Sequence, residues 1–554
     1  MQYFKNFMPK ASLRNCLLFA GLMISPLISL AQITDKAPKT TTSSPEDTTT
    51  TVEILPGVRK LEFRKVNDST QLQILAGNVK LKQGKTYFDC DSCVINNNSH
   101  VFEAWGHVHI NDSDTANAYA SHLLYLINKK LAYLDGGVTL TDGKGSLTTP
   151  DLEYDVETKI GIYKHGGKVI NKKTVLTSQE GYYYTDLKDV YFKNKVLLND
   201  PAYFIKTDSL LYNTELQTAR FIAETFIRDS SGRTIDTKEG YYNMKTGKAE
   251  FGQRPVVHQK NLLATGDQMM RDDSAGITQM RGNAIIIDSA NQTTIIAGEI
   301  FINHKTNSFL AIKKPLMIVK QENDSIYITA DTLFSARLSD LYAQKDSVID
   351  DSAIKGKKFV TTDNKDSSNR YFEAYRHVRI FSDSLQAVSD SLFYSFKDSV
   401  FRLFQDPVVW AKESQVTGDT ILLFTKNKKA DRMKVFNNSF LVNKLDPEIY
   451  NQVKSTRLDG YFKDGALDSV RASGLAQCIY YVQDEDSAYS GINESQSDVL
   501  DTYFGNQQLQ KVVFRSAVSG TIWPIKQKDP KEMRLPNFRW LEERRPKTKF
   551  EMYE

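Results

Sequence analysis

Two closely spaced cysteines are the first residues in this sequence that could support redox or metal chemistry. Cys90 and Cys93 form a C-x-x-C motif, the spacing found in thiol redox centres and in one half of many zinc sites. The motif lies in a strand-like segment rather than at a helix start, and no second pair completes four zinc ligands. We therefore treat Cys90 and Cys93 as a candidate disulfide of an exported protein. Cys478 lies on the apolar face of an alternating run and is expected to be a buried thiol.

A pair of histidines is the other candidate for metal binding. His107 and His109 are two residues apart, so on a regular strand they would share a face and could bind zinc. In a duplicated copy of this segment, offset by 270 residues, His377 remains but the second position is Arg379. Because the pair is not kept in the copy, we expect no metal site.

Residues for catalysis form no pattern that we can identify in the sequence. The repeated Asp–Ser pairs, such as Asp390–Ser391, fall at predicted turns, where both side chains bond their own backbone. Their spacing does not assemble an acid–base pair of carboxylates. The sequence also has no Gly-rich phosphate loop, no G-x-S-x-G and no H-E-x-x-H motif. We therefore predict a protein that is not an enzyme and that uses no cofactor.

The N-terminus predicts export. An apolar run over residues 16–30 follows three basic residues and ends in small residues suited to cleavage, so residues 1–31 are predicted to be a signal peptide rather than a membrane anchor. Its removal changes the net charge from +4 to 4 − 3 = +1, which gives no reason to expect nucleic-acid binding. Residues 32–58 form a Thr-rich linker. The basic C-terminal tail, 526–554, is expected to be solvated, with contact to an acidic partner or a lipid headgroup as the alternative.

Internal repetition decides the expected fold. One ladder places an aromatic residue at steps of 29, 29, 29 and 30, at Tyr125, Tyr154, Tyr183, Tyr212 and Tyr242. A second ladder, small-x-Gly-x-Val-x-hydrophobic, runs between the first with a similar period. Each rung alternates apolar and polar residues and ends at turn-forming clusters, which is typical of half-buried strands. We therefore predict an all-β fold, an elongated β-jellyroll or β-solenoid of stacked repeats of about 29 residues.

A larger duplication divides the chain. Residues 102–110, Phe-Glu-Ala-Trp-Gly-His-Val-His-Ile, match residues 372–380, Phe-Glu-Ala-Tyr-Arg-His-Val-Arg-Ile. We predict two tandem β-regions, 59–337 and 371–525, separated by a polar joint over residues 338–370.

These rungs resemble the OstA-like, LptA-type family of periplasmic lipopolysaccharide-transport and organic-solvent-tolerance proteins. The resemblance rests on Gly-Asn-Val-Lys-Leu at 77–81, on Ala-Trp-Gly-His-Val-His-Ile at 104–110 with Asp114–Thr115 next, and on the repeated Asp-x-Leu-x-Tyr element. It implies a folded-over β-sheet whose hydrophobic groove holds the acyl chains of lipopolysaccharide. It also implies a periplasmic location, with a possible association with the outer membrane, and end-to-end strand pairing with other lipopolysaccharide-transport proteins. Segments near the C-terminus that look like longer envelope members of this family are 470–480, 521–524 and 537–546.

The predicted function follows from this resemblance. We expect a lipopolysaccharide-binding transport protein that shields acyl chains in a hydrophobic β groove and passes lipid towards the outer membrane. Periodicity alone fits a closed, filled core equally well, and the resemblance favours the groove. The alternative function is a β-helical envelope protein that binds or cleaves polysaccharide, with a column of carboxylates and aromatic residues on one outer face. The candidate groove residues are Val108, Ile110, Val138, Leu140, Val196, Leu198, Ala284 and Ile286.

Overall fold

The computed structural model describes most of the chain after residue 50. The predicted signal peptide, residues 32–50 of the Thr-rich linker and most of the polar joint lie outside the described residues, as does the Asp114–Thr115 pair. All described residues belong to one compact unit, and within them no helix has the length and hydrophobicity to cross a bilayer. The described residues are 51–553 without 68–69, 113–115, 321–323, 342–368, 427–428, 464–465, 485–487 and 506–507.

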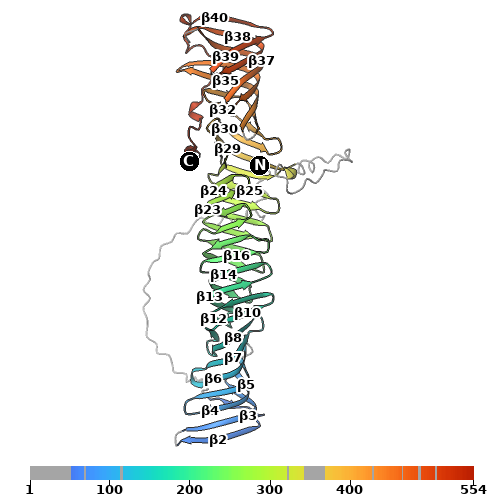
Figure 1. Cartoon of the computed structure of the whole chain (residues 1–554), viewed down its shortest axis with the longest axis vertical. Coiled ribbons are helices and arrows are strands. Elements are labelled where there is room, and N and C mark those ends of the chain that lie inside the picture. Colours follow the sequence, from blue (N-terminus) through green and yellow to red (C-terminus); the bar gives the residue numbers. More distant parts are fainter. Residues whose placement is uncertain are drawn as a thin grey trace, which may run out of the picture. The chain divides into compact units, whose positions relative to one another are not determined.

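The described residues form a 40-stranded sheet in which every strand pairing is antiparallel. Figure 1 shows the strands following one another in chain order. The first strands are β1 (Glu53–Ile54), β2 (Lys60–Asn67), β3 (Thr70–Gln83), β4 (Thr86–Asn96), β5 (Val101–Asp112), β6 (Ala116–Leu126), β7 (Leu131–Thr141) and β8 (Ser146–Asp155). The other long strands of the first region are β13 (Asp189–Asn199), β14 (Tyr203–Asn213), β23 (Ile277–Asp288) and β24 (Thr293–Asn303).

Between these, pairs of short strands take the place of one long strand. The pairs are β9 (Ile160–Tyr163) and β10 (Gly167–Asn171), β11 (Thr174–Ser178) and β12 (Glu180–Tyr184), β15 (Thr218–Phe221) and β16 (Thr225–Asp229), β17 (Thr234–Thr237) and β18 (Glu239–Asn243), β19 (Lys248–Gly252) and β20 (Val256–Gln259), β21 (Leu262–Thr265) and β22 (Gln268–Asp272), β25 (Ser308–Ile312) and β26 (Leu316–Lys320), and β27 (Ser325–Thr329) and β28 (Thr332–Arg337).

The remaining elements follow the polar joint. They are β29 (Arg370–Phe381), β30 (Gln386–Ser395), β31 (Val400–Phe404), β32 (Val408–Ala411), β33 (Ser414–Thr417), β34 (Thr420–Lys426), β35 (Lys429–Asp446), β36 (Ile449–Lys463), β37 (Ala466–Gln483), β38 (Tyr489–Gly505), β39 (Gln508–Arg515) and β40 (Ser519–Pro524). Short 3-10 helices lie at η2 (Ile127–Lys129), η3 (Ile525–Gln527), η4 (Glu542–Arg544) and η5 (Lys549–Met552).

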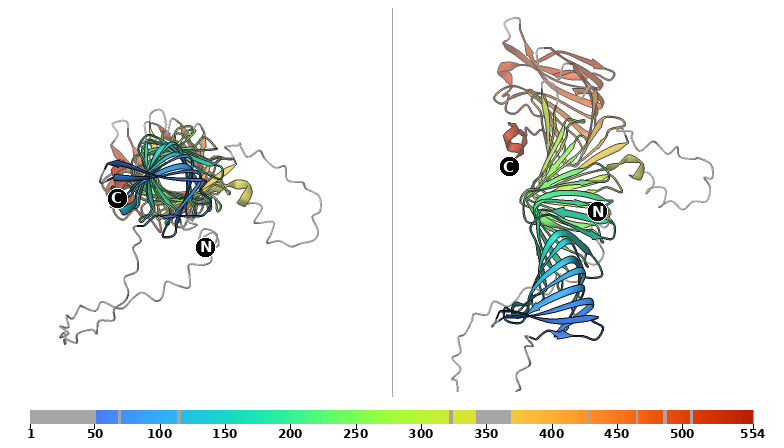
Figure 2. Two further views of the ribbon diagram at one scale, coloured as in Figure 1. Left: turned by 90° about the horizontal axis from the view of Figure 1, so that it is seen from below. Right: turned by 60° about the horizontal axis from the view of Figure 1, so that its bottom comes forward.

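Each rung of the sheet is bent into two arms. In β14, residues 210–213 pair with β15, whereas residues 203–207 pair with β16. We call the half of each rung that carries the tyrosine ladder arm A and the other half arm B. Two consecutive antiparallel rungs, one in each direction, account for a period near 29 residues. The right-hand view of Figure 2 shows the first rungs lying side by side in this way.

A two-residue β-bulge makes the bend in alternate long rungs, and the rung paired with each of them has a single unpaired residue at the same point, such as Ser121 in β6. In β5 the register shifts between Trp105 and Val108, and the two residues between them, Gly106 and His107, have φ values of 76° and 44°. This left-handed conformation favours glycine, and the bulge re-aims the strand. The small-x-Gly-x-Val motif of the second ladder therefore marks the corner of the rung, with the valine as the first inward residue of arm B.

The interior lies between the two arms. The ladder residues Tyr125, Tyr154, Tyr183 and Tyr212 are fully buried, as are the second-ladder valines Val138, Val169 and Val196. They belong to one continuous hydrophobic cluster that extends from Leu75 to Leu500. Burial of this apolar surface is the main favourable contribution to folding.

The two predicted regions are joined by hydrogen bonds into one sheet. β28 and β29 pair from Thr332↔Tyr375 to Arg337↔Arg370, so the polar joint is an insertion between two adjacent, paired strands. The duplicated motif lies in β5 and β29, and both strands carry the bulge at the same point.

The C-terminal tail packs on the outer face of arm B. Gln452 donates to the Met533 carbonyl (2.9 Å) and accepts from the Leu535 N–H (2.8 Å). Gln415 binds the backbone of Arg539 and Leu541 in the same way (2.8 and 2.7 Å). We call residues 529–552 the C-terminal strap. The expectation of a solvated tail is wrong, because apolar residues of the tail pack against an apolar surface of the sheet.

The surface under the strap explains why it binds. Strands of arm B here are apolar on both faces, and the strap covers the outer one: Met533 and Leu535 pack with Phe440, Val442 and Tyr481. Its basic residues are largely used locally, as in the Arg544–Asp406 ion pair at 2.6 Å.

Close packing at the corner gives a test of the fold. A Cβ atom on Gly181 would lie 2.4 Å from the hydroxyl of Tyr163, whose side chain is fully buried. Gly181→Ala should therefore lower the free energy of unfolding by about 1–3 kcal/mol, measured by urea denaturation. Gly252→Ala is the control: its nearest neighbour is 3.8 Å away, so it should be neutral or slightly stabilising. Equal stability of the two variants would contradict the packing.

Candidate functional site

The eight candidate groove residues all lie on arm B. Val108, Ile110, Val138, Leu140, Val196, Leu198 and Ala284 are at most 1% exposed, and Ile286 is partly buried against the same cluster. The structure thus brings them together in one interior, as the sequence predicted for a shared apolar surface. Their role as lipid contacts stays a prediction.

The interior is filled where arms A and B face each other in the first rungs. A Cβ added to Gly161, on arm A, would lie 2.9 Å from a methyl group of Leu140, on arm B. Side chains of the two arms are therefore already in van der Waals contact. A lipid chain could enter here only if the arms moved apart, because protein interiors are packed without spare volume of that size.

The free ends of the two arms are joined by polar contacts, which we call the seam. The Tyr125 hydroxyl donates to Gln83 (2.7 Å) and the Tyr154 hydroxyl donates to Asp112 (2.9 Å). Asn171 donates to the carbonyl of Thr214 (2.6 Å). In each case a residue at or just beyond the end of arm B meets the end of arm A. The tyrosine ring fills the core while its hydroxyl is satisfied at the edge.

Sequence reasoning missed the arm B side of the seam. Gln83, Asp112, Asp142, Asn171 and Asp200 follow one another at steps of 29, 30, 29 and 29 residues. Each member is polar and able to accept a hydrogen bond, but the residue type changes from copy to copy. A search for polar residues at the period of the tyrosine ladder would have found them.

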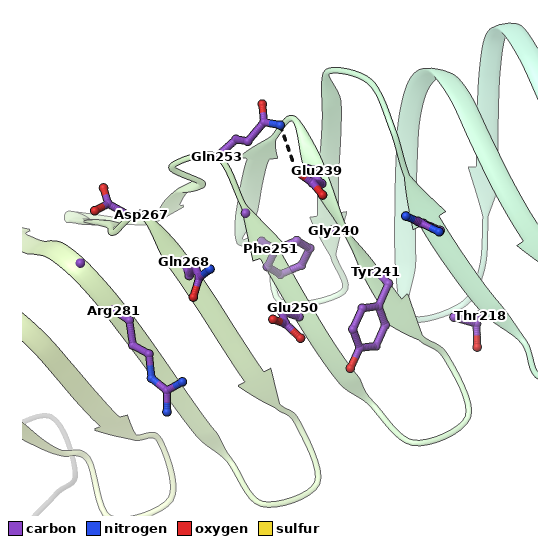
Figure 3. A pocket seen from close by; sticks show the side chains of 13 residues that line it. Thr218, Glu239, Gly240, Tyr241, Glu250, Phe251, Gln253, Asp267, Gln268 and Arg281 are labelled. Atoms are coloured by element: carbon purple, nitrogen blue, oxygen red, sulfur yellow. Dashed lines mark hydrogen bonds between the residues drawn. The ribbon is translucent and has the colours of Figure 1, made fainter. Parts of the chain in front are cut away.

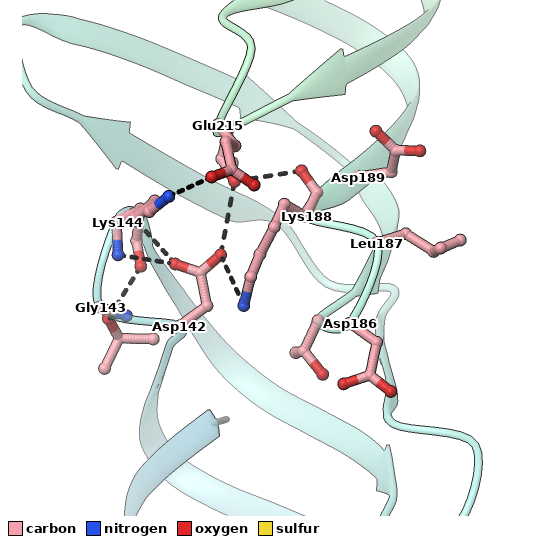
Figure 4. A network of polar contacts seen from close by, with 12 residues as sticks. Asp142, Gly143, Lys144, Asp186, Leu187, Lys188, Asp189 and Glu215 are labelled. Carbon is pink, nitrogen blue, oxygen red and sulfur yellow. Dashed lines mark hydrogen bonds and ion pairs between the residues drawn. The ribbon is translucent and has the colours of Figure 1, made fainter. Parts of the chain in front are cut away.

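Asp142 is the most enclosed carboxylate of the seam (Figure 4). Its side chain is fully buried, and it accepts the backbone N–H groups of Lys144 (2.9 Å) and Gly145 (2.8 Å). Lys188 lies 3.8 Å away, and a Lys144–Glu215 ion pair closes over the group. Burial alone would raise the pKa of Asp142, but the two backbone hydrogen bonds and Lys188 outweigh it and hold the pKa below its usual value.

Further along the interior, ion pairs replace the neutral contacts of the seam. Arg233 pairs with Asp229 on arm B, and Arg271 of arm A lies 3.9 Å from the same carboxylate. Arg271 also pairs with Asp273 at 2.5 Å, and the Tyr203 hydroxyl donates to Asp273. The two arginine side chains are only 10% and 12% exposed.

Apolar side chains of the interior are partly exposed next to this cluster. Leu262, whose register with Asp288 places it on the inward face, is 42% exposed. Val257, Ala264 and Ile286 are only partly buried there. Among the described rungs of the first region, this stretch offers apolar interior surface without prior separation of the arms.

A separate hollow of about 980 Å³ lies on the outer face of arm A (Figure 3). Its lining includes Arg220, Tyr241, Glu250 and Arg281, together with Phe251, which belongs to the hydrophobic cluster of the interior. Glu239 at its rim accepts a hydrogen bond from Gln253 (2.9 Å). Charges of both signs and two aromatic rings, Tyr241 and Phe251, do not form the column of carboxylates and aromatic residues expected of a polysaccharide-binding face.

The two histidines do not share a face. The bulge places His107 on the exposed corner, where its ring lies 2.7 Å from Asp91. His109 instead contacts Asn117 (2.9 Å) and stacks on Tyr119 with ring centroids 4.6 Å apart. The expectation of a common face is wrong because the bulge interrupts strand alternation. Among the described residues no group of three metal-binding side chains occurs.

The cysteines lie in the core. Cys90 and Cys93 are buried, free thiols in the structure, so the candidate disulfide is not formed there. The contact with Cys90, followed by burial, raises the pKa of the Cys93 thiol. Cys478 is buried as expected, and burial raises its pKa to about 12.

The seam predicts a pH-dependent contribution to stability. Because the folded state lowers the pKa of Asp142, its stabilisation is present above the unfolded value of about 3.9 and is lost as the pH falls through the lower folded value. Asp142→Asn should lower the free energy of unfolding by about 1–3 kcal/mol near neutral pH, and this difference should shrink in acid.

The control is Asp151→Asn. That carboxylate is 41% exposed and pairs only with exposed His165 at 2.7 Å, so its loss should change stability by no more than about 0.5 kcal/mol. Urea denaturation at both pH values checks the pair. A pH-independent cost of Asp142→Asn would contradict the electrostatic account of the seam.

Comparison with known proteins bears on the first region. A family model described as OstA-like protein matches residues 51–208, the stretch that holds the first rungs and the seam from Gln83 to Asp200. No curated protein matches the chain.

One solved structure is similar to part of the chain. It is LptH of Pseudomonas aeruginosa, described as the LptA-homologous periplasmic component of the conserved lipopolysaccharide transport device. The identity is 12%, the match covers 26% of this chain and 82% of LptH, and the TM-score is 0.19, a likeness too low to support an argument. Residues 51–208 of this chain are therefore similar to OstA-like proteins.

Proposed function

We propose that the chain binds a lipid with several acyl chains, lipopolysaccharide or a related envelope lipid, between arms A and B and passes it along the rungs. The observation that carries the proposal is the apolar interior, which continues through hydrogen-bonded rungs from Leu75 to Leu500. The match of residues 51–208 to the OstA-like family model supports the same reading. We assign the protein no catalytic role, and place it in the periplasm on the strength of its N-terminal sequence.

Energetics favour such a carrier. Each methylene group removed from water contributes about 0.8 kcal/mol, whereas a typical seam hydrogen bond contributes about 0.5–1.5 kcal/mol net. Separation of the arms at a rung costs its seam hydrogen bonds and also the apolar contacts between the arms, and the buried methylene groups of the lipid would have to replace both. Because successive rungs are alike, a bound chain meets no deep minimum as it moves, so direction must come from partner proteins.

The accessible stretch near Ile286 is the proposed entry to the interior. Apolar surface is already exposed there at Leu262, and the neighbouring Arg233 and Arg271 can face the anionic headgroup of a lipid. The other rungs would then open in sequence as acyl chains advance.

Partners can bind at the first strand. Among the described residues β2 pairs only with β3, so its outer edge is open to a further strand. Leu61, Phe63 and Val66 on β2 are 46%, 58% and 59% exposed. An edge of this kind can accept a strand from another transport protein by β-augmentation.

Two adjacent isoleucines make a matched test. Ile286 faces the interior, whereas Ile287, the next residue, is on the opposite face and 39% exposed. A photo-reactive amino acid at position 286 should crosslink to lipopolysaccharide in the cell envelope, and the same probe at position 287 should not. Mass spectrometry of the adduct identifies the lipid.

A charged residue introduced at these two positions should affect lipid binding only at the inward one. Ile286→Arg should abolish copurification of lipid with the intact chain, while Ile287→Arg should leave it unchanged, with both variants folded by circular dichroism. Equal crosslinking at the two positions, or bound polysaccharide in place of lipid, would count against the groove and favour the polysaccharide alternative.

A further inference from the structure

The outer face of arm A changes its charge along the chain. On β5 to β8 two pairs of residues that face each other in register, Glu103↔Leu124 and Tyr133↔Glu153, point outward. The residues two positions before and after each of these four in the same strand also point outward. These positions hold no lysine or arginine. They hold five carboxylates: Glu103, Asp135, Asp151, Glu153 and Asp155.

The same face is basic on β34 to β39. Lys434 pairs in register with Asp459, Asp459 with Arg471, and Arg471 with Asp501, so all four side chains are on the outward face of arm A. We call the outward residues of arm A on β34 to β39 the basic face. Away from the strand ends and the bulges at Asp431 and Asp468, its charged members are two carboxylates, Asp459 and Asp501, and six cations, Arg432, Lys434, Arg457, Arg471, Lys511 and Arg515; Lys426, Lys429 and Lys463 add three cations at the strand ends.

The cations of the basic face stand above its carboxylates. The side chains of Arg457, Arg471 and Arg515 are 44%, 56% and 57% exposed. Asp501 is only 6% exposed, because Arg471 (2.7 Å) and Arg515 (3.0 Å) both bind it. Asp459 is 17% exposed and is bound by Arg457 at 2.8 Å. A partner approaching this face therefore meets positive charge.

Aromatic rings alternate with these cations. Arg432 lies over Phe424 with its guanidinium 4.4 Å from the ring centroid, and Arg457 lies 5.6 Å from the ring of Phe436. Tyr461 and Tyr503 are 51% and 39% exposed. The overall balance of charge in the sequence hides this surface, since the acidic outer face on β5 to β8 compensates for it.

We propose that the basic face docks on an anionic phospholipid surface. Lysine and arginine side chains are attracted to anionic headgroups, and exposed aromatic rings are stable at the depth of the headgroups. A sheet face on which cations and aromatic rings alternate matches the chemistry of an anionic membrane surface. The basic face has no arrangement of groups that would select a nucleic-acid base or a sugar. This docking is independent of lipid binding in the interior, and would hold the second region at a membrane while the first region carries the acidic face.

Vesicle sedimentation tests the proposal with the full chain. The protein should sediment with vesicles that contain phosphatidylglycerol and not with vesicles of phosphatidylcholine alone. The variant Arg432→Gln/Lys434→Gln/Lys511→Gln should reduce the vesicle partition coefficient at least tenfold. Salt at about 0.5 M should release the unmodified chain, because the interaction of exposed charges is screened.

A matched variant controls for the loss of charge. Lys168→Gln/Lys206→Gln/Arg228→Gln removes three exposed cations from the outer face of arm B, one of which, Arg228, also lies over a phenylalanine ring at 5.2 Å. It should bind vesicles like the unmodified chain. The proposal is overturned if the chain does not bind anionic vesicles, if both triple variants bind alike, or if the basic-face variant loses self-association in sedimentation velocity instead, which would assign this face to the acidic face of a second copy.

Discussion

The bend of the rungs, which is set by a two-residue bulge in alternate strands, is the constraint on which the rest of the structure depends. A flat amphipathic sheet of this length would leave one apolar face in water. Because Gly106 and His107, and their counterparts in other rungs, adopt positive φ values, each strand turns back and faces its own apolar side. Arms A and B then bury each other, and the repeats stack into one interior that is built almost wholly from strands.

The seam follows from this bend, because the free ends of the arms must also be closed. Tyrosine suits the position, since its ring belongs to the core and its hydroxyl reaches the edge, where Gln83 or Asp112 accepts a hydrogen bond. These contacts are individually weak compared with the core. The rungs can therefore separate at the seam while the bulge corner and the strand ladder hold, which is what a carrier of acyl chains requires. The ion pairs around Arg233 and Arg271 close the same edge where the apolar surface is least buried.

Sequence reasoning captured the parts of the fold that repeat residue types. The tyrosine and valine ladders predicted buried inward residues, and all eight candidate groove residues lie in the interior. It could not find the arm B side of the seam, because Gln, Asp and Asn share hydrogen-bonding capacity rather than identity. It misplaced His107 because a bulge is invisible to strict strand alternation. It also took the C-terminal strap for a solvated tail, since the surface that binds Met533 and Leu535 is assembled from strands far away in the sequence.

Lipid content of the native protein tests the central claim most directly. The full chain should be purified from its own envelope in a mild detergent and its bound lipids weighed by native mass spectrometry. The account predicts at least one multi-acylated lipid per chain, and an equal or higher lipid content when the seam is weakened by Tyr154→Phe together with Asp112→Ala, because fewer contacts then oppose separation of the arms. A chain that is purified free of lipid, with its interior as filled as in the structure, would contradict the account.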